Sequence, residues 1–191
     1  MIARLQGTIA LKEFSFIIVD VSGVGYKVFV PVHVLSVIKQ GDNAVVFTYM
    51  HVRDDALELY GFMDHRDLRL FEMLIGVSGI GCKTALGIFG NGTRDEIVSA
   101  ILRADAAFFT GVPRLGTKNS QKLIIELKGK LGDSSAVALD SLVGDGGEDV
   151  VEALKSFGYT QKEALEAFKE VRDNAQDASG RIKLALKYLG K

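Results

Sequence analysis

Two short glycine-rich segments contain the residues best suited to chemistry. The first reads GVSGIGCK from residue 76, and the second reads GVPRLGTK from residue 111. They share the pattern G-V-[SP]-x-h-G-x-K, where h is apolar, and each lies between segments of helical periodicity. Glycine lets a backbone approach a phosphate closely, and a lysine just inside the next helix adds a charge beside unpaired N–H groups. The repeat predicts two helix–hairpin–helix units that bind DNA phosphates without reading sequence.

The predicted DNA contacts are the hairpin glycines and the polar residues that open the following helices. They are Gly76, Gly79, Gly81, Lys83 and Thr84 in the first hairpin, and Gly111, Arg114, Gly116, Thr117 and Lys118 in the second. The second hairpin departs from the first because Arg114 stands where the first has Gly79, and Ser120 where the first has Ala85. Arg114 either strains the hairpin or adds a phosphate contact, and we favour the contact.

Other interpretations of the first hairpin are weaker. A nucleotide-binding P-loop needs its lysine directly after the second glycine, whereas here Cys82 intervenes and the preceding segment is helical. One such hairpin would be read as an ordinary turn between packed helices, but two in register, each with a lysine, favour DNA binding. Cys82 lies near a helix N-terminus, which can lower a thiol pKa. It has no partner in the sequence, so we expect it to be inert.

Charge is distributed unevenly along the 191 residues. The whole chain has 23 basic and 24 acidic residues, for a net charge of -1. Residues 65–132 contain 10 basic and 6 acidic residues, for a net charge of +4, whereas 1–64 and 133–191 are net acidic. A polyanion is therefore expected to bind the middle third only.

The composition also limits the function classes. One cysteine excludes an internal disulfide framework, and the three histidines lie at scattered positions that predict no zinc site. No apolar run approaches the ~20 residues of a membrane span, and the N-terminus does not resemble a signal peptide. We expect a cytoplasmic protein without metal or cofactor.

The elements that position the hairpins differ along the chain. Residues 1–64 predict about five short strands, at 2–10, 16–21, 25–30, 44–51 and 56–60, with residues 24, 26, 28 and 30 on one face. Such a small antiparallel set favours an oligonucleotide-binding (OB) barrel or an SH3-like barrel.

Helical patterns follow the strands. Residues 65–132 predict short helices joined by glycine turns, with a capping box at Thr93 and Glu96 and a longer helix over 118–131. Residues 133–147 are small and acidic and predict a flexible linker. Residues 148–191 predict three helices, with Gly158 after the first and a second capping box at Thr160 and Glu163. The fold class is therefore α+β and multidomain.

Several motifs together resemble the RuvA family, the Holliday-junction-binding subunits of the bacterial branch-migration machine. They are the two hairpins, the N-terminal MIARLQGTI, HVRDDALELYGF over 51–62 and LIIELK over 123–128. The resemblance covers essentially the whole chain. It implies an OB-like barrel, a tandem helix–hairpin–helix domain and a three-helix tail similar to ubiquitin-associated domains.

The resemblance also implies partners. It implies a homotetramer that binds four-way junctions, and two tetramers can enclose one junction. The tail recruits the hexameric motor RuvB, which uses ATP and magnesium, and the resolvase RuvC can share the junction. The implied process is recombination and DNA repair, including the SOS response to DNA damage.

Two further sites follow from the resemblance. Asp54 and Asp55 match an acidic pin on the turn between the last two barrel strands, where carboxylates repel continuous duplex. In the tail, a small bundle cannot bury all its apolar residues, and we expect Leu154, Phe157 and Leu186 to contact the motor.

Two alternatives remain open. An enzyme such as a nuclease or glycosylase could use the hairpins for docking, but Asp54 and Asp55 have no evident third metal ligand, and a non-catalytic subunit is preferred. Alternatively, the chain is an interaction scaffold whose hairpins are only structural, in which case mutating Lys83 and Lys118 together would leave its function intact.

Overall fold

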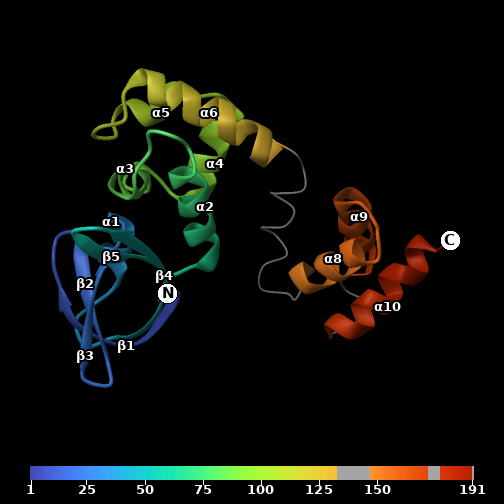
Figure 1. The fold of residues 1–191 in the computed structure, drawn as a ribbon, viewed down its shortest axis with the longest axis horizontal. Coiled ribbons are helices and arrows are strands. Elements are labelled where there is room, and N and C mark those ends of the chain that lie inside the picture. Colours follow the sequence, from blue (N-terminus) through green and yellow to red (C-terminus); the bar gives the residue numbers. More distant parts are fainter. Residues whose placement is uncertain (133–146, 172–176, 191) are drawn as a thin grey trace. The chain divides into compact units, whose positions relative to one another are not determined.

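The computed structural model describes residues 1–132, 147–171 and 177–190. These residues form two compact units, Met1–Lys128 and Gly129–Lys191. Figure 1 shows a β-barrel and a helical region in the first unit and a helical tail in the second. The mixed α+β class is confirmed. The predicted linker over 133–147 lies outside the described residues except for Gly147, which begins a helix.

Five strands form a closed barrel in the order β1-β2-β3-β5-β4. They are β1 (Arg4–Lys12), β2 (Phe16–Val21), β3 (Val24–Phe29), β4 (Asn43–Arg53) and β5 (Ala56–Phe62). All pairs are antiparallel except β3 with β5, where Val28 pairs with Leu59. The predicted set of strands is confirmed, and this OB-like arrangement replaces the SH3-like alternative.

Alternating β-branched residues fill the barrel, because successive side chains of a strand point to opposite faces. Val28 is fully buried, whereas Val24, two pairs of residues earlier on the same face, is 54% exposed. Val24 lies at the tight β2–β3 turn, beyond the covered part of the sheet. At Gly61 a Cβ would lie 2.5 Å from Val28 Cγ1 and 2.6 Å from Val46 Cγ1, so only glycine fits between these strands.

A short helix, α1 (Val32–Val37), was not predicted. Its sequence VHVLSV is rich in β-branched residues, which favour strands. Pro31 precedes it as N-cap, and Val34 and Leu35 are buried in the barrel core. Tertiary packing therefore overrides local propensity here.

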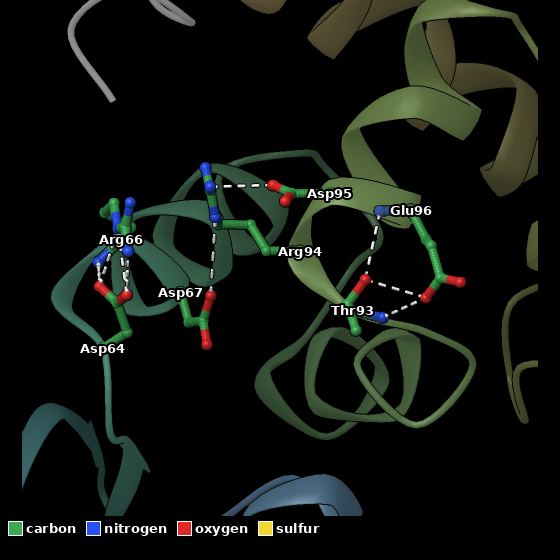
Figure 2. Close-up of polar contacts among 7 residues, drawn as sticks. All are labelled: Asp64, Arg66, Asp67, Thr93, Arg94, Asp95 and Glu96. Atoms are coloured by element: carbon green, nitrogen blue, oxygen red, sulfur yellow. Dashed lines mark hydrogen bonds and ion pairs between the residues drawn. The ribbon is translucent and has the colours of Figure 1, made fainter. Parts of the chain in front are cut away.

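Five helices follow the barrel, and the last of them, α6, ends four residues beyond the first unit. They are α2 (His65–Ile75), α3 (Cys82–Ile88), α4 (Arg94–Leu102), α5 (Ala106–Thr110) and α6 (Thr117–Gly132). Asp64 caps α2 by accepting from the Arg66 N–H at 2.8 Å. Arg94 links α4 to α2, because its guanidinium lies 3.9 Å from Asp67 and 2.8 Å from Asp95 (Figure 2).

The predicted capping boxes are both confirmed. The Thr93 N–H donates to Glu96 Oε2 at 2.8 Å, and Thr93 Oγ1 accepts from the Glu96 N–H (Figure 2). In the tail, the Thr160 N–H likewise donates to Glu163 Oε2 at 2.8 Å. Each box satisfies backbone donors that the first helical turn leaves unpaired.

Aromatic side chains join the barrel to the hairpin helices. Phe71 of α2 stacks on Tyr60 with ring centres 5.5 Å apart and lies 5.1 Å from Phe62. Phe62 also lies 5.0 Å from Phe89, which follows α3. All four rings are almost completely buried, so the hairpins are fixed relative to the end of β5 by one apolar cluster.

The tail consists of α8 (Gly147–Ser156), α9 (Gln161–Val171) and α10 (Ala178–Leu189). Its buried core includes Val150, Leu154 and Phe168, with Leu186 packed against it. Gly158 follows α8 at φ +93°, as its predicted capping role requires.

Candidate nucleic-acid interface

The two hairpins have the same backbone structure. In each, the residue after the first glycine and the apolar residue three positions later donate N–H bonds to carbonyls three residues earlier. The bonds are Val77 to Leu74 (3.1 Å), Ile80 to Val77 (3.0 Å), Val112 to Phe109 (3.2 Å) and Leu115 to Val112 (3.1 Å). The four donor residues are buried, so they anchor each hairpin and leave its intervening residues exposed.

Arg114 occupies the backbone conformation of the glycine that it replaces. Gly79 has φ +92° and Arg114 has φ +67°, both in the left-handed region. That region is unfavourable for a residue with a Cβ, so Arg114 holds local strain. The residue is exposed, which leaves the guanidinium available to a ligand. Of the two expected effects, the strain is confirmed and the phosphate contact stays a prediction.

Backbone donors of both hairpins are free. No acceptor within the described residues takes the N–H of Gly79 or Gly81, nor that of Arg114 or Gly116. These residues are exposed, so the N–H groups are accessible to solvent or to an anion. Free N–H groups on alternate residues of a turn can donate to anionic oxygens such as those of phosphate.

The polar residues after each hairpin differ in exposure. Lys83 has a side chain that is 61% exposed, and Thr117 and Lys118 are exposed as well. Thr84, in the first turn of α3, is only 9% exposed, and its predicted DNA contact stays a prediction. The helical repeat turns Thr84 toward the core while Lys83, one residue earlier, faces outward. Gly76 and Gly111 end the preceding helices with ordinary helical φ values of -68° and -78°.

The hairpins lie next to each other in the folded unit. A Cβ at Gly79 would be 3.4 Å from Asn119 Oδ1, which belongs to the first turn of α6. A Cβ at Gly87 of α3 would be 3.3 Å from Val112 Cγ1. Asn119 is half-buried beside both hairpins. The repeat pattern did not single it out, because the corresponding residue after the first hairpin is Thr84 and the two residue types differ.

The acidic pair lies where it was predicted. Asp54 and Asp55 form the exposed turn between β4 and β5, and Arg53 Nε lies 3.6 Å from Asp55 Oδ1. Glu58 lies on β5. Its Oε1 is 3.6 Å from Nζ of Lys83, in α3, and 4.0 Å from Nη2 of Arg53, at the end of β4. Sequence reasoning missed Glu58. The signal was available, because strand alternation places it on the same face as the buried Tyr60.

Cys82 does not have the environment of a reactive thiol. It is 6% exposed, and burial raises its pKa, which corrects the expected effect of the nearby helix N-terminus. Throughout the described residues, no three His, Cys, Asp or Glu side chains are grouped so as to hold a metal ion. None of the described helices is both long and apolar enough to cross a membrane.

The three residues predicted to meet a partner in the tail have different environments. Phe157, just after α8, is 62% exposed. Leu186 is partly buried against the tail core. Leu154 is fully buried, which corrects its prediction as a contact residue, because the three-helix core needs it. Tyr188, at 43% exposure, is the other large apolar side chain exposed in the described tail.

The fold and the paired hairpins define a class: an OB-like barrel joined to a tandem helix–hairpin–helix module. Family models agree, matching "RuvA N terminal domain" at residues 1–61, "SAM-like Helix-hairpin-helix tandem" at 71–130 and "RuvA, C-terminal domain" at 145–190. Proteins called Holliday junction branch migration complex subunit RuvA are similar over their full length and that of this chain. They include those of Paraburkholderia xenovorans (39% identical), Alkaliphilus oremlandii (38%) and Dechloromonas aromatica (35%). The chain belongs to the RuvA family.

Proposed function

We propose that this chain binds four-way DNA junctions as the non-catalytic subunit of a branch-migration complex. The observation that carries the proposal is the pair of matched hairpins with free backbone N–H groups and a lysine in phase. Such groups bind phosphates of either strand without regard to base sequence. Full-length similarity to proteins named as junction branch-migration subunits supports the junction as the ligand.

Selection of a junction over a duplex depends on Asp54 and Asp55 in this proposal. Both carboxylates lie on an exposed turn. Facing a crossover, they repel the phosphates of a continuous duplex and favour the open form, in which the arms diverge. A homotetramer would bring four such turns together and multiply weak hairpin contacts through effective concentration. Two tetramers would enclose the junction.

The motor activity belongs to a partner in this proposal. The tail recruits a RuvB ATPase through Phe157 and the adjoining surface, and ATP and magnesium are used there. A resolvase of the RuvC type shares the same junction, and the complex acts in the cytoplasm. The exposed Phe157 on the small bundle supports the tail as the docking domain.

A gel-shift comparison tests the proposal. A four-way junction and a duplex of equal length are titrated at two salt concentrations with competitor DNA and magnesium. We expect preference for the junction, weakening with salt and without cleavage. The D54N/D55N variant should bind duplex more tightly and lose that preference, whereas K83Q/K118Q should weaken both complexes. Equal binding of both DNAs by the unaltered chain contradicts the junction assignment, and magnesium-dependent cleavage supports a nuclease instead.

A further inference from the structure

The first hairpin has a counter-ion supplied by the barrel. Glu58 of β5 places Oε1 3.6 Å from Lys83 Nζ and 4.0 Å from Arg53 Nη2. Its other oxygen, Oε2, accepts a hydrogen bond from the Tyr60 hydroxyl at 2.9 Å. The Glu58 carboxylate therefore contacts three groups at once: Arg53 beside the acidic turn, Tyr60 of the barrel, and Lys83 of the first hairpin unit.

Glu58 is held in place rather than free to leave. Its side chain is 15% exposed, and the Tyr60 that anchors it is 1% exposed and stacked on Phe71. Burial by itself would raise the pKa of Glu58, but the Tyr60 hydrogen bond and the charges of Lys83 and Arg53 outweigh it and lower the pKa. The carboxylate is thus negatively charged at neutral pH and fixed beside Lys83.

The second hairpin lacks this arrangement. Lys118, the counterpart of Lys83, is exposed and forms no ion pair with any residue that the structure describes. Arg114 adds a second cation to that hairpin. The two hairpins match in backbone geometry but differ in net charge at the phosphate-facing surface.

We propose that Glu58 limits the grip of the first hairpin on DNA, acting as an intramolecular counter-ion to Lys83; this rests on the phosphate-binding role proposed above. A phosphate that approaches Lys83 meets a fixed pair of opposite charges instead of a full positive charge. Because the net charge of the pair is near zero, Lys83 releases few counterions from the DNA when it binds. The first hairpin therefore contacts passing duplex weakly, while the second supplies most of the electrostatic attraction.

E58Q tests this inference, because glutamine keeps an oxygen that accepts from Tyr60 but removes the charge. Duplex affinity is measured across a salt series for the unaltered chain, E58Q, K83Q and E58Q/K83Q. We expect E58Q to tighten binding about 1.5- to five-fold per bound chain, the range of a partly exposed ion pair. The slope of log affinity against log salt should steepen by about 0.9 per bound chain. When Lys83 is already replaced by glutamine, adding E58Q should change duplex affinity and salt slope by no more than the E13Q control changes them.

The control is E13Q, which makes the same change in net charge at an exposed residue of the β1–β2 turn. Unfolding temperatures of all variants establish that E58Q is folded. If E58Q weakens binding, leaves it unchanged, or tightens it equally with Lys83 removed, the counter-ion role is refuted. If E58Q and E58Q/K83Q have the same affinity and salt slope, Lys83 makes no phosphate contact even without its counter-ion, and the phosphate-binding role of the first hairpin fails. If K83Q weakens binding while E58Q does not tighten it, only the counter-ion role fails, so the two failures are distinguishable.

Discussion

Arg114 combines a strained backbone with an exposed cation, so replacing it by glycine should separate stability from DNA binding. A left-handed conformation destabilises a residue with a Cβ by about 1–2 kcal/mol. Glycine relieves that strain, but its greater freedom in the unfolded chain offsets about 0.5–1 kcal/mol. The net gain for R114G is about 0.5–1 kcal/mol. At roughly 4 °C per kcal/mol, the unfolding temperature of the first unit should rise by about 2–4 °C.

The same substitution should weaken DNA binding. Removing one phosphate-facing charge lowers the salt slope by about 0.9 per bound chain. R114N is the matched variant, because asparagine tolerates the left-handed conformation and also lacks the charge. Calorimetric unfolding and a salt series of duplex titrations measure the two effects independently.

The reciprocal change is G79A in the first hairpin. It places a Cβ at φ +92°, 3.4 Å from Asn119 Oδ1, and should destabilise by about 1–2 kcal/mol. An unfolding temperature of R114G at or below that of the unaltered chain would refute the strain argument. Unchanged DNA affinity and salt slope would refute the phosphate contact of Arg114.

Three further predictions follow from the barrel and the tail. G61A should destabilise the barrel by about 1–3 kcal/mol, seen as a lower urea midpoint, because its Cβ overlaps Val28 and Val46; an unchanged midpoint contradicts the crowding. F157A should change stability by less than about 0.5 kcal/mol yet weaken binding to a RuvB-type ATPase in a pull-down titration, and retained binding would exclude this surface. Hydrogen bonds from the Thr160 hydroxyl and N–H lower the pKa of the Glu163 carboxyl. The ionised carboxylate therefore stabilises the folded tail above pH 4.5, and this stabilisation is lost as pH falls through the lowered pKa. Unfolding followed against pH should show the E163Q variant less stable than the unaltered chain at pH 7, with a difference that shrinks in acid.

Local patterns in the sequence were sufficient for much of this protein. Strand alternation, the two capping boxes and the repeated hairpin depend on residues close together in the chain, and the structure agrees with these predictions. The motif set also indicated the family, which the comparisons establish. Such features are readable because their energetics are local: a cap, a turn or an apolar stripe is specified within a few residues.

Other features were decided only by tertiary packing. Burial of Leu154 and Thr84 depends on which helix face meets a neighbour, and the α1 helix forms against its β-branched propensity because the barrel covers it. The Glu58–Lys83 pair joins residues 25 positions apart and exists because the Tyr60–Phe71 stack sets the hairpin beside β5. Long-range contacts of this kind depend on how two elements dock, and the spacing of residues along one chain does not contain that information.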